Sequence, residues 1–323
     1  MRRRELLTAA GVAATFASFP AGAQPAARVK RIGFMANLPL EPVQRFRKKL
    51  EEIGYVEGRN LIIDYRFAEG RDDRYPAFAA EFVQMPVDII VVWGTPAAFA
   101  AKRATTKIPI VIGAAGDVLN VGLVTSLSRP EANITGFIAV NVDLEEKRLE
   151  LLKDVLPTLR RVGVITNAQN PLNRVNLDIA RRATQRLGVN LEIFEVQNSQ
   201  GVEEALRKLA DSRPDAALLG ADTMLLSERK RIAEQMAALR IPAIYPFREY
   251  MDVGGLIIYG ANLSTLFEHA AGYVDRILRG EQPGNLPVQQ ATAFEVILNQ
   301  KTADALGITF PPIVLVRADQ VIE

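Results

Sequence analysis

The sequence predicts an α/β protein with two lobes, each a parallel sheet covered by helices. Short apolar runs alternate with amphipathic helical stretches from Arg31 onward. Roughly 130 residues later the same order begins again, with Arg, Val or Ile, and Gly at the first apolar run of each unit and Ile-Pro at the fourth. Alternation of strands and helices favours a parallel sheet, and its repetition favours two such sheets.

The first unit contains four predicted strands with helices between them. Apolar side chains recur at helical spacing over residues 42–58, and Gly54 is well placed to end that helix. Further helices are predicted at 74–85 and 97–105. The strands are predicted at residues 31–37, 60–67, 88–94 and 108–114.

The second unit repeats this plan. Its predicted strands lie at residues 161–167, 190–196, 215–222 and 241–247. Its predicted helices lie at residues 173–188, 201–212 and 227–240.

The N-terminus predicts a secretory signal peptide. The basic start MRRRE precedes an uncharged stretch over residues 6–27, and Ala21-Gly22-Ala23 gives an A-x-A cleavage pattern. The most apolar part is too short for a membrane span, which needs about 20 residues. Arg3-Arg4-Glu5 also resembles the twin-arginine signal, so the export route stays open. We expect removal of residues 1–23 and a periplasmic protein.

Composition excludes several classes of function. Removing residues 1–23 takes away three arginines and one glutamate, which leaves 36 basic and 36 acidic residues. A chain this close to neutral lacks the excess positive charge that is typical of proteins that bind nucleic acid. The absence of cysteine excludes disulfides, thiolate metal sites, cysteine nucleophiles and a lipoprotein anchor.

The carboxyl ends of the predicted strands outline a ligand cleft. In open α/β sheets ligands bind at this edge, and two facing rows of strand-end loops would line one cleft. The rows are Ala36-Asn37-Leu38, Trp93-Gly94-Thr95 and Ala115-Gly116-Asp117 in the first unit, and Thr166-Asn167, Gly220-Ala221-Asp222 and Tyr245-Pro246-Phe247 in the second.

The stretch VVWGTPAAFAAKRAT (91–105) predicts a site for a ligand carboxylate. We expect Thr95 to be the N-cap and Pro96 the first helical residue, so that the N–H groups of Ala97 and Ala98 are free. Gly94 leaves room for a ligand, and the free N–H groups and the helix dipole favour an anion. The alternative is that Thr-Pro only caps a helix.

The acidic and aromatic residues at strand ends have two interpretations each. Asp117 and Asp222 could each pair with an ammonium group or cap the segment that follows. Trp93, Tyr245, Phe247 and Tyr259 could form an apolar wall for an aromatic or branched ligand, or belong to the core.

Motifs for catalysis and cofactor binding are missing. There is no G-x-G-x-x-G after a strand, no Walker A sequence and no G-x-S-x-G. The single histidine, His269, is interpreted as a surface or rim residue of an amphipathic helix. We therefore expect no cofactor, no metal and no enzymatic activity.

Several ordered blocks resemble the ABC-transporter substrate-binding family that includes tryptophan/tyrosine-binding proteins. The resemblance covers the chain from about Lys30 to its end. The blocks are GYVEGRNLIIDYRFAEGRDDRYPAFAAE (54–81), GTPAAFAAKRAT (94–105), IPIVIGAAGD (108–117), GLVTSLSRPEANITGF (122–137), KRLELLKDVLP (147–157), IPAIYPFREYMDVGGLIIYG (241–260) and FEVILNQKTADALGITFPP (294–312).

The resemblance implies a type I periplasmic binding protein, in which two Rossmann-like lobes joined by a multi-strand hinge close around a ligand. The implied lobes are residues 30–140 with about 263–291, and residues 141–262 with about 292–323. It implies that Thr95, Pro96 and Ala97 hold the ligand carboxylate and that Asp117 lies in the cleft. The other residues that it suggests for the cleft are Asn167, Asp222, Tyr245 and Tyr259.

Two positions depart from the family pattern. Asn37 and Trp93 stand where smaller residues are common, so the ligand's identity stays open.

We thus expect a monomeric periplasmic solute-binding protein of an ABC importer. It would capture a small carboxylate ligand, either an amino acid or an aromatic or branched organic acid, and deliver it to a permease served by an ATPase. One alternative is a ligand-sensing module of a membrane receptor. Another is an exported enzyme that uses Asp117 and Asp222 as an acid/base pair.

Overall fold

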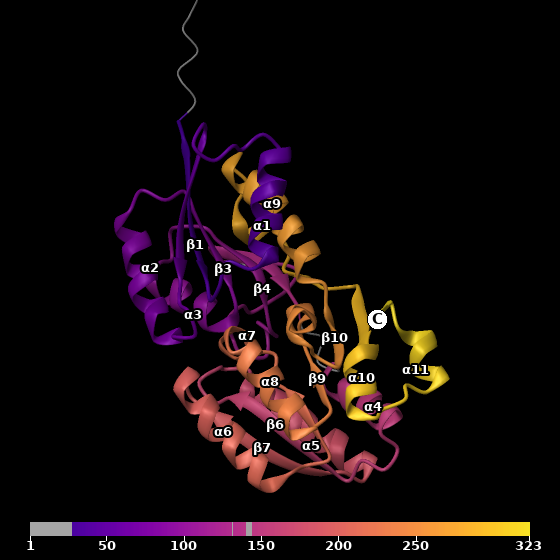
Figure 1. Ribbon diagram of the computed structural model, residues 1–323. Coiled ribbons are helices and arrows are strands. Elements are labelled where there is room, and N and C mark those ends of the chain that lie inside the picture. The colour runs from indigo at the N-terminus through magenta and orange to yellow at the C-terminus, as the bar shows by residue number, and fades with distance from the viewer. Residues whose placement is uncertain (1–27, 131, 140–143) are drawn as a thin grey trace, which may run out of the picture.

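Two sheets with helices on both faces make up the molecule (Figure 1). The computed structural model describes residues 28–130, 132–139 and 144–323. The predicted signal peptide and the predicted boundary between residues 140 and 141 lie outside these ranges. In the described part of the chain, no helix has the length and apolar character needed to cross a bilayer.

The first sheet is six-stranded and parallel, in the order β11-β5-β4-β3-β1-β2. Its strands are β1 (Lys30–Ala36), β2 (Leu61–Phe67), β3 (Ile89–Trp93), β4 (Ile110–Ala115), β5 (Ile134–Ile138) and β11 (Gln289–Gln290). Its helices are α1 (Glu41–Glu52), α2 (Tyr75–Gln84), α3 (Thr95–Ala104) and α9 (Leu263–Leu278), with the 3₁₀ helices η1 (Asp72–Arg74) and η3 (Pro283–Asn285).

Helices cover both faces of this sheet. Figure 1 shows α2 and α3 on one side and α1 and α9 on the other. Successive side chains of β3 point to opposite faces of the sheet. Ile89, Val91 and Trp93 lie in the apolar cluster that includes α1 and α9, whereas Ile90 and Val92 lie in the cluster that includes α2 and α3. A strand buried on both faces has no polar side, as its sequence IIVVW predicts.

The second sheet is seven-stranded, in the order β13-β12-β10-β9-β8-β6-β7, and only its β10–β12 pair is antiparallel. Its strands are β6 (Arg161–Asn167), β7 (Asn190–Val196), β8 (Ala216–Leu219), β9 (Ala243–Tyr245), β10 (Ile257–Ala261), β12 (Phe294–Asn299) and β13 (Gln320–Ile322). Its helices are α4 (Leu144–Val155), α5 (Asn173–Leu187), α6 (Ser199–Ser212), α7 (Thr223–Ser227), α8 (Arg229–Leu239), α10 (Gln300–Leu306), α11 (Pro312–Arg317) and the 3₁₀ helix η2 (Arg248–Val253).

The predicted fold class, two α/β lobes with parallel sheets, is confirmed. We call the part of the chain around the first sheet lobe one and the part around the second sheet lobe two. The strand predicted at 215–222 is shorter than expected, since β8 ends at Leu219 and Asp222 already caps α7. The sequence did not predict β5, α4, α7 or β10, nor most elements after β10.

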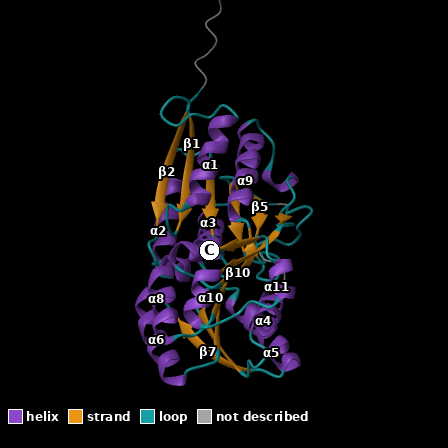
Figure 2. Ribbon diagram, turned by 45° about the vertical axis from the view of Figure 1, so that its right-hand side comes forward, coloured by secondary structure: helices purple, strands orange, loops and turns teal. Residues whose placement is uncertain are grey.

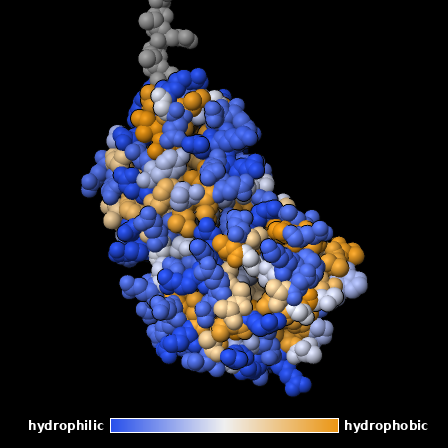
Figure 3. All heavy atoms as spheres, viewed as in Figure 1, coloured by the Kyte–Doolittle hydropathy of each residue, from blue (hydrophilic) through white to orange (hydrophobic). Residues whose placement is uncertain are grey.

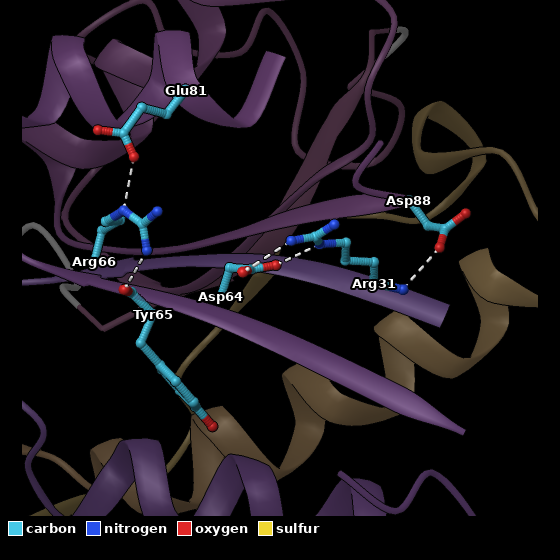
Figure 4. Close-up of polar contacts among 6 residues, drawn as sticks. All are labelled: Arg31, Asp64, Tyr65, Arg66, Glu81 and Asp88. Carbon is cyan, nitrogen blue, oxygen red and sulfur yellow. Dashed lines mark hydrogen bonds and ion pairs between the residues drawn. The ribbon is translucent and has the colours of Figure 1, made fainter. Parts of the chain in front are cut away.

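Polar contacts fix the edge of the first sheet (Figure 4). Arg31 Nε donates to Asp64 Oδ2 at 2.6 Å, and the Arg31 backbone N–H donates to Asp88 Oδ2 at 2.8 Å. These bonds join β1 to β2 and to the start of β3. Arg66 on β2 reaches Glu81 of α2 at 2.7 Å, which ties the helix to the sheet.

One buried apolar cluster runs through both lobes. It contains Phe34 and Phe267 of lobe one together with Leu206, Met224 and Tyr245 of lobe two. The strands β1 and β2 point toward the boundary between the lobes (Figure 2). The lobes therefore meet at the carboxyl ends of these strands.

Candidate functional site

The strand-end loops of the two lobes touch each other. Asn37, after β1, donates from Nδ2 to Thr223 Oγ1 at 3.4 Å. Ser199 Oγ of lobe two donates to the carbonyl of Gly70 in lobe one at 3.1 Å. Asn37 and Thr223 are both buried by this contact. The structure thus shows the lobes closed on each other.

Glycines make this close approach possible. A Cβ atom on Gly94 would lie 3.0 Å from Thr223 Oγ1. A Cβ atom on Gly116 would lie 1.7 Å from Leu172 Cδ1 of lobe two, which is far inside van der Waals contact. Two glycines that the sequence places at strand ends therefore mark the surface where the lobes meet.

The first turn of α3 faces the same boundary. The helix begins at Thr95, and its N-cap is Gly94 with φ of 97°. The prediction that Thr95 caps this helix is wrong, since the Thr95 hydroxyl instead accepts from the Gly116 backbone N–H at 3.1 Å. The positive φ needs glycine, which has no Cβ to clash.

The prediction of free amides holds for only part of this turn. Ala98 N–H donates to the Gly94 carbonyl at 3.1 Å, so it is not free. Among the residues that the structure describes, nothing accepts from the N–H groups of Thr95 and Ala97. Pro96 has no N–H, and unpaired donors in a first helical turn favour an anion.

A pair of carboxylates, one from each lobe, lies beside this turn. Asn167 Nδ2 is 3.2 Å from Asp222 Oδ2 and 3.4 Å from Asp72 Oδ2, so one amide is shared by both. Asn37 Nδ2 donates to Asp72 Oδ1 at 3.1 Å. Asn170 Nδ2 donates to Asp222 Oδ2 at 2.7 Å. We call Asp72 and Asp222 the acidic pair.

Loss of solvent makes ionisation of the acidic pair unfavourable, with Asp222 buried and Asp72 partly buried. Loss of solvent, followed by the nearby charge of Asp222, raises the pKa of Asp72 to about 7. Burial also raises the pKa of Asp222, whose side chain is 4% exposed. The capping interpretation of Asp222 is confirmed, since its Oδ1 accepts from Met224 N–H and Leu225 N–H at the start of α7, while its Oδ2 accepts from the two asparagines.

A buried phenol adjoins the acidic pair. Tyr75 is fully buried, and its hydroxyl has no partner within hydrogen-bond geometry in the described part of the chain. Burial, then the charges of Asp72 and Asp222, raise the pKa of Tyr75 well above its usual value. The phenol therefore stays protonated and can donate to a ligand.

Asp117 makes only local contacts. Its Oδ1 accepts from the backbone N–H groups of Leu119 and Asn120, and its Oδ2 accepts from Asn120 Nδ2. This is the capping interpretation, with all three donors supplied by the following turn.

Two of the predicted aromatic residues lie away from the boundary cavities. Tyr245 stacks on Tyr250 at 4.4 Å between ring centroids, and it is 2% exposed. Tyr259 packs against Phe294, and its carbonyl accepts from Arg148. In this closed structure Tyr245 is therefore a core residue, whereas Tyr259 is partly buried and packs against the core of lobe two.

Trp93 and Phe247 line a small cavity at the boundary. The cavity measures about 30 Å³, enough for a water molecule or two. The Phe267 ring meets the Trp93 indole edge-on at 5.2 Å between centroids and holds it in place. Other lining residues are Gly94, Thr95, Pro96, Ala114, Ala115, Gly116, Ala139, Asn170, Ala221, Thr223 and Leu263.

A larger hollow of about 930 Å³ adjoins this cavity and opens to solvent. Lobe one contributes Asp72, Tyr75, Pro96 and Phe99 to its wall, and lobe two contributes residues 197–200. Pro96 lines both spaces, so the hollow leads inward to the first turn of α3. Figure 3 shows the polar surface around the boundary on one face of the molecule.

Sequence reasoning missed Asp72, Tyr75, Asn170 and Thr223. The signal for Asp72 was available, because Gly70-Arg71-Asp72 follows the predicted strand at 60–67 and so lies at the same sheet edge. Asn170 and Thr223 each lie near a predicted strand end. Tyr75 lies in a helix, and nothing in its spacing separates it from a core residue. The described residues contain no group of three His, Cys, Asp or Glu side chains that could hold a metal ion.

Comparison with known proteins identifies a family and a curated relative that are similar to this chain. The family model for ABC transporter substrate binding proteins matches residues 39–322. A tyrosine-binding protein of Clostridioides difficile (strain R20291) is 29% identical over 268 residues, 81% of this chain and 75% of the relative.

Two solved structures share the fold. A conserved domain protein from Vibrio cholerae is 27% identical with a TM-score of 0.85, covering 91% of this chain and all of the other. The ABC domain from Streptococcus pneumonia in complex with L-Trp is 24% identical with a TM-score of 0.83, covering 91% of this chain and 99% of the other.

Proposed function

Because the chain belongs to the ABC transporter substrate-binding protein family, we propose that it captures a small carboxylate ligand between its lobes and delivers it to an ABC permease. The ligand is an amino acid or an aromatic or branched organic acid. The observation that carries this proposal is the convergence of a helix turn with unpaired N–H groups and of the acidic pair at one lobe boundary.

The two features suit the two ends of an amino acid. The N–H groups of Thr95 and Ala97 suit the carboxylate, and the acidic pair suits the ammonium group. The Tyr75 hydroxyl adds a buried donor. Asp117 is the weaker candidate for the ammonium group, since its carboxylate already accepts three local hydrogen bonds. The name of the tyrosine-binding relative and the L-Trp complex support an amino acid.

The mechanism is a shift between open and closed lobes. A ligand that contacts both lobes stabilises the closed arrangement in which Asn37 meets Thr223 and Gly116 meets Leu172. The cavity of about 30 Å³ is too small for an amino acid to enter, so binding requires the lobes to part first. The permease then recognises the closed form.

The lobes are proposed to be residues 30–140 with 263–291, and residues 141–262 with 292–323. Two observations support this division. Helix α9 packs beside α1 on the first sheet, and β11 pairs with β5 of the same sheet. The chain then crosses back to join β12 to the second sheet.

The proposed setting is the periplasm, after cleavage of residues 1–23. There the protein acts as a monomer with an ABC permease and ATPase, and it has no enzymatic activity. Membership of a substrate-binding family supports this assignment.

Ligand-induced thermal stabilisation of the mature protein tests the proposal. Native mass spectrometry first shows whether a ligand is co-purified. L-tyrosine, L-tryptophan and L-leucine are then compared with their analogues that lack the amine. At 100 times the Kd, a ligand adds about 2.7 kcal/mol to the free energy of unfolding, which raises the Tm by several degrees.

Matched variants locate the ammonium site. Asp222→Asn should abolish the response to the amino acid, because asparagine can still cap α7 but carries no charge. Asp117→Asn should leave the response in place. Equal stabilisation by the amine-free acids would refute the ammonium assignment, and no response to any carboxylic acid would refute the proposed ligand class.

A further inference from the structure

The acidic pair crosses the lobe boundary. Asp72 belongs to η1 of lobe one, and Asp222 caps α7 of lobe two. The single Asn167 amide, within 3.4 Å of both, bridges them. Opening the lobes separates the two carboxylates, and closing brings them to either side of this one amide, with Asp222 buried and Asp72 partly buried.

The groups around the pair supply hydrogen bonds but no positive charge. Asp72 is faced by Asn37 from the end of β1 and Asn167 from β6, and the charges of Asp222 and Asp73 oppose its ionisation. Asp222 is faced by Asn167, by Asn170 and by the two N–H groups of α7. The phenols of Tyr75 and Tyr250 also lie within range of Asp222.

Basic residues do not compensate the pair. In the described part of the chain, no Lys or Arg side chain forms an ion pair with Asp72 or Asp222, and the nearby Arg71 is paired with Asp73. Asp222 is buried, Asp72 is partly buried, and the two carboxylates share one amide, so desolvation and mutual repulsion oppose ionisation of both when no cation compensates them. The closed cleft therefore requires one positive charge from elsewhere.

We propose that a single proton on the acidic pair substitutes for the ligand's ammonium group, so that acid closes the ligand-free protein and a cationic ligand must displace this proton. This regulation rests on the proposed function, because it assumes that the lobes open and close around a ligand.

The direction of the effect follows from linkage. We expect the open form to expose Asp72 to water and so return its pKa to near the ordinary value of 3.8, whereas in the closed form burial and the charge of Asp222 raise the pKa to about 7. Below pH 3.8 protonation therefore contributes its full stabilisation to the closed form of the ligand-free protein. This stabilisation is lost as the pH rises toward the closed-form pKa of about 7. Across this window the closed-to-open ratio falls by up to about tenfold per pH unit.

Small-angle X-ray scattering of the ligand-free protein tests this proposal without knowledge of the ligand. The radius of gyration of the mature protein is measured from pH 5 to pH 9. We expect it to be small in acid and to increase with rising pH along a one-proton curve. A radius that does not change with pH would overturn the proposal.

Variants separate the acidic pair from other titrating groups. Asp72→Asn removes one charge and keeps the shape of the side chain, so it should stay compact over the whole range. Asp222→Asn should behave in the same way and serves as a second test. Asp73→Asn, at an exposed carboxylate one residue away, should keep the transition of the wild type. Circular dichroism checks that each variant is folded.

The outcomes distinguish this proposal from the proposed function. If scattering is independent of pH but amino acids still raise the Tm, the proton effect is wrong and the ligand-binding function stands. If no carboxylic acid raises the Tm but Asp72→Asn abolishes a pH-dependent closure, the proton effect stands and the ligand class is wrong. A pH transition that persists in both Asn variants would refute the role of the acidic pair.

Discussion

At the residue scale, the site depends on buried polar side chains that hold backbone groups in place. Thr95 is 2% exposed, and its hydroxyl accepts from the Gly116 N–H, which joins the start of α3 to the loop after β4. Both segments line the boundary cavity. A residue that the sequence predicts as a cap therefore organises two strand-end loops at once.

Replacing Thr95 should weaken both stability and ligand binding. Thr95→Val keeps the shape but leaves the Gly116 N–H without its acceptor, which costs about 1–3 kcal/mol in free energy of unfolding. The loop after β4 then loses its position, so the ligand-induced rise in Tm should shrink. Chemical denaturation and thermal-shift titration measure the two effects.

Thr135 provides the matched control. Its buried hydroxyl donates to the Leu286 carbonyl at 2.7 Å, far from the acidic pair in the chain and outside the lining of either boundary space. Thr135→Val should lower stability to a similar extent and leave the ligand response unchanged. Equal loss of the ligand response in both variants would contradict a specific role for Thr95.

At the element scale, a buried ion pair within α4 is hydrogen-bonded to β10 next to two crossings between the lobes. Arg148 donates from one terminal nitrogen to Glu145 Oε1 and from Nε to the Tyr259 carbonyl, each at 2.8 Å. The side chains of Arg148 and Glu145 are 2% and 4% exposed. Helix α4 follows the first crossing, and β10 precedes the second, so the pair fixes these two segments against each other.

Removal of one partner should be strongly destabilising. Arg148→Met leaves the Glu145 carboxylate buried without its cation, which costs about 3–5 kcal/mol. The double variant Arg148→Met/Glu145→Leu should recover much of this loss, because apolar replacement of a whole buried pair is often nearly neutral. Denaturant unfolding of the three proteins checks this. A single variant as stable as the wild type would show that the pair contributes little.

At the scale of the whole molecule, function depends on how closely the lobes approach. Gly116 lies against Leu172 of the other lobe, and a Cβ atom there would come within 1.7 Å of Leu172 Cδ1. Trp93, the only tryptophan of the chain, lines the cavity beside this contact. Its fluorescence therefore reports on closure.

Gly116→Ala should obstruct closure while the lobes stay folded. We expect a weaker ligand affinity, and a smaller change in Trp93 emission on addition of the ligand that the thermal panel identifies. The double variant Gly116→Ala/Leu172→Ala should restore both, because the second change removes the opposing methyl groups.

Gly272 is the control for a general effect of adding a methyl group. It lies inside α9, and a Cβ atom there would have no other atom within 4 Å. Alanine at this position should raise stability by about 1 kcal/mol without changing ligand binding. Failure of Leu172→Ala to rescue Gly116→Ala would show that closure is not what the substitution impairs.

Particular residues show how much of the candidate site could be predicted from the sequence. Asn37, Gly94, Thr95, Asn167 and Asp222 all lie at strand ends and all reach the lobe boundary, as their positions predict. Tyr245 and Tyr259 also follow the strand pattern, yet Tyr245 is buried in the core and Tyr259 packs against it from a partly buried position. Position along a strand gives the sheet edge, but the rotation of a side chain depends on what packs around it.

Periodicity along the chain was enough to predict the two lobes, the first four strands of each with most of the helices between them, and several of the loops that line the boundary. Such periodicity is local, so it can be read without knowledge of the fold. Three features could be learned only from the folded chain: Asp72 and Asp222 share the Asn167 amide, Gly94 rather than Thr95 caps α3, and Asp117 accepts hydrogen bonds from its own loop. The interaction between two charges depends on their distance in space. The spacing of residues in the sequence does not show which carboxylates lie near each other when the lobes close.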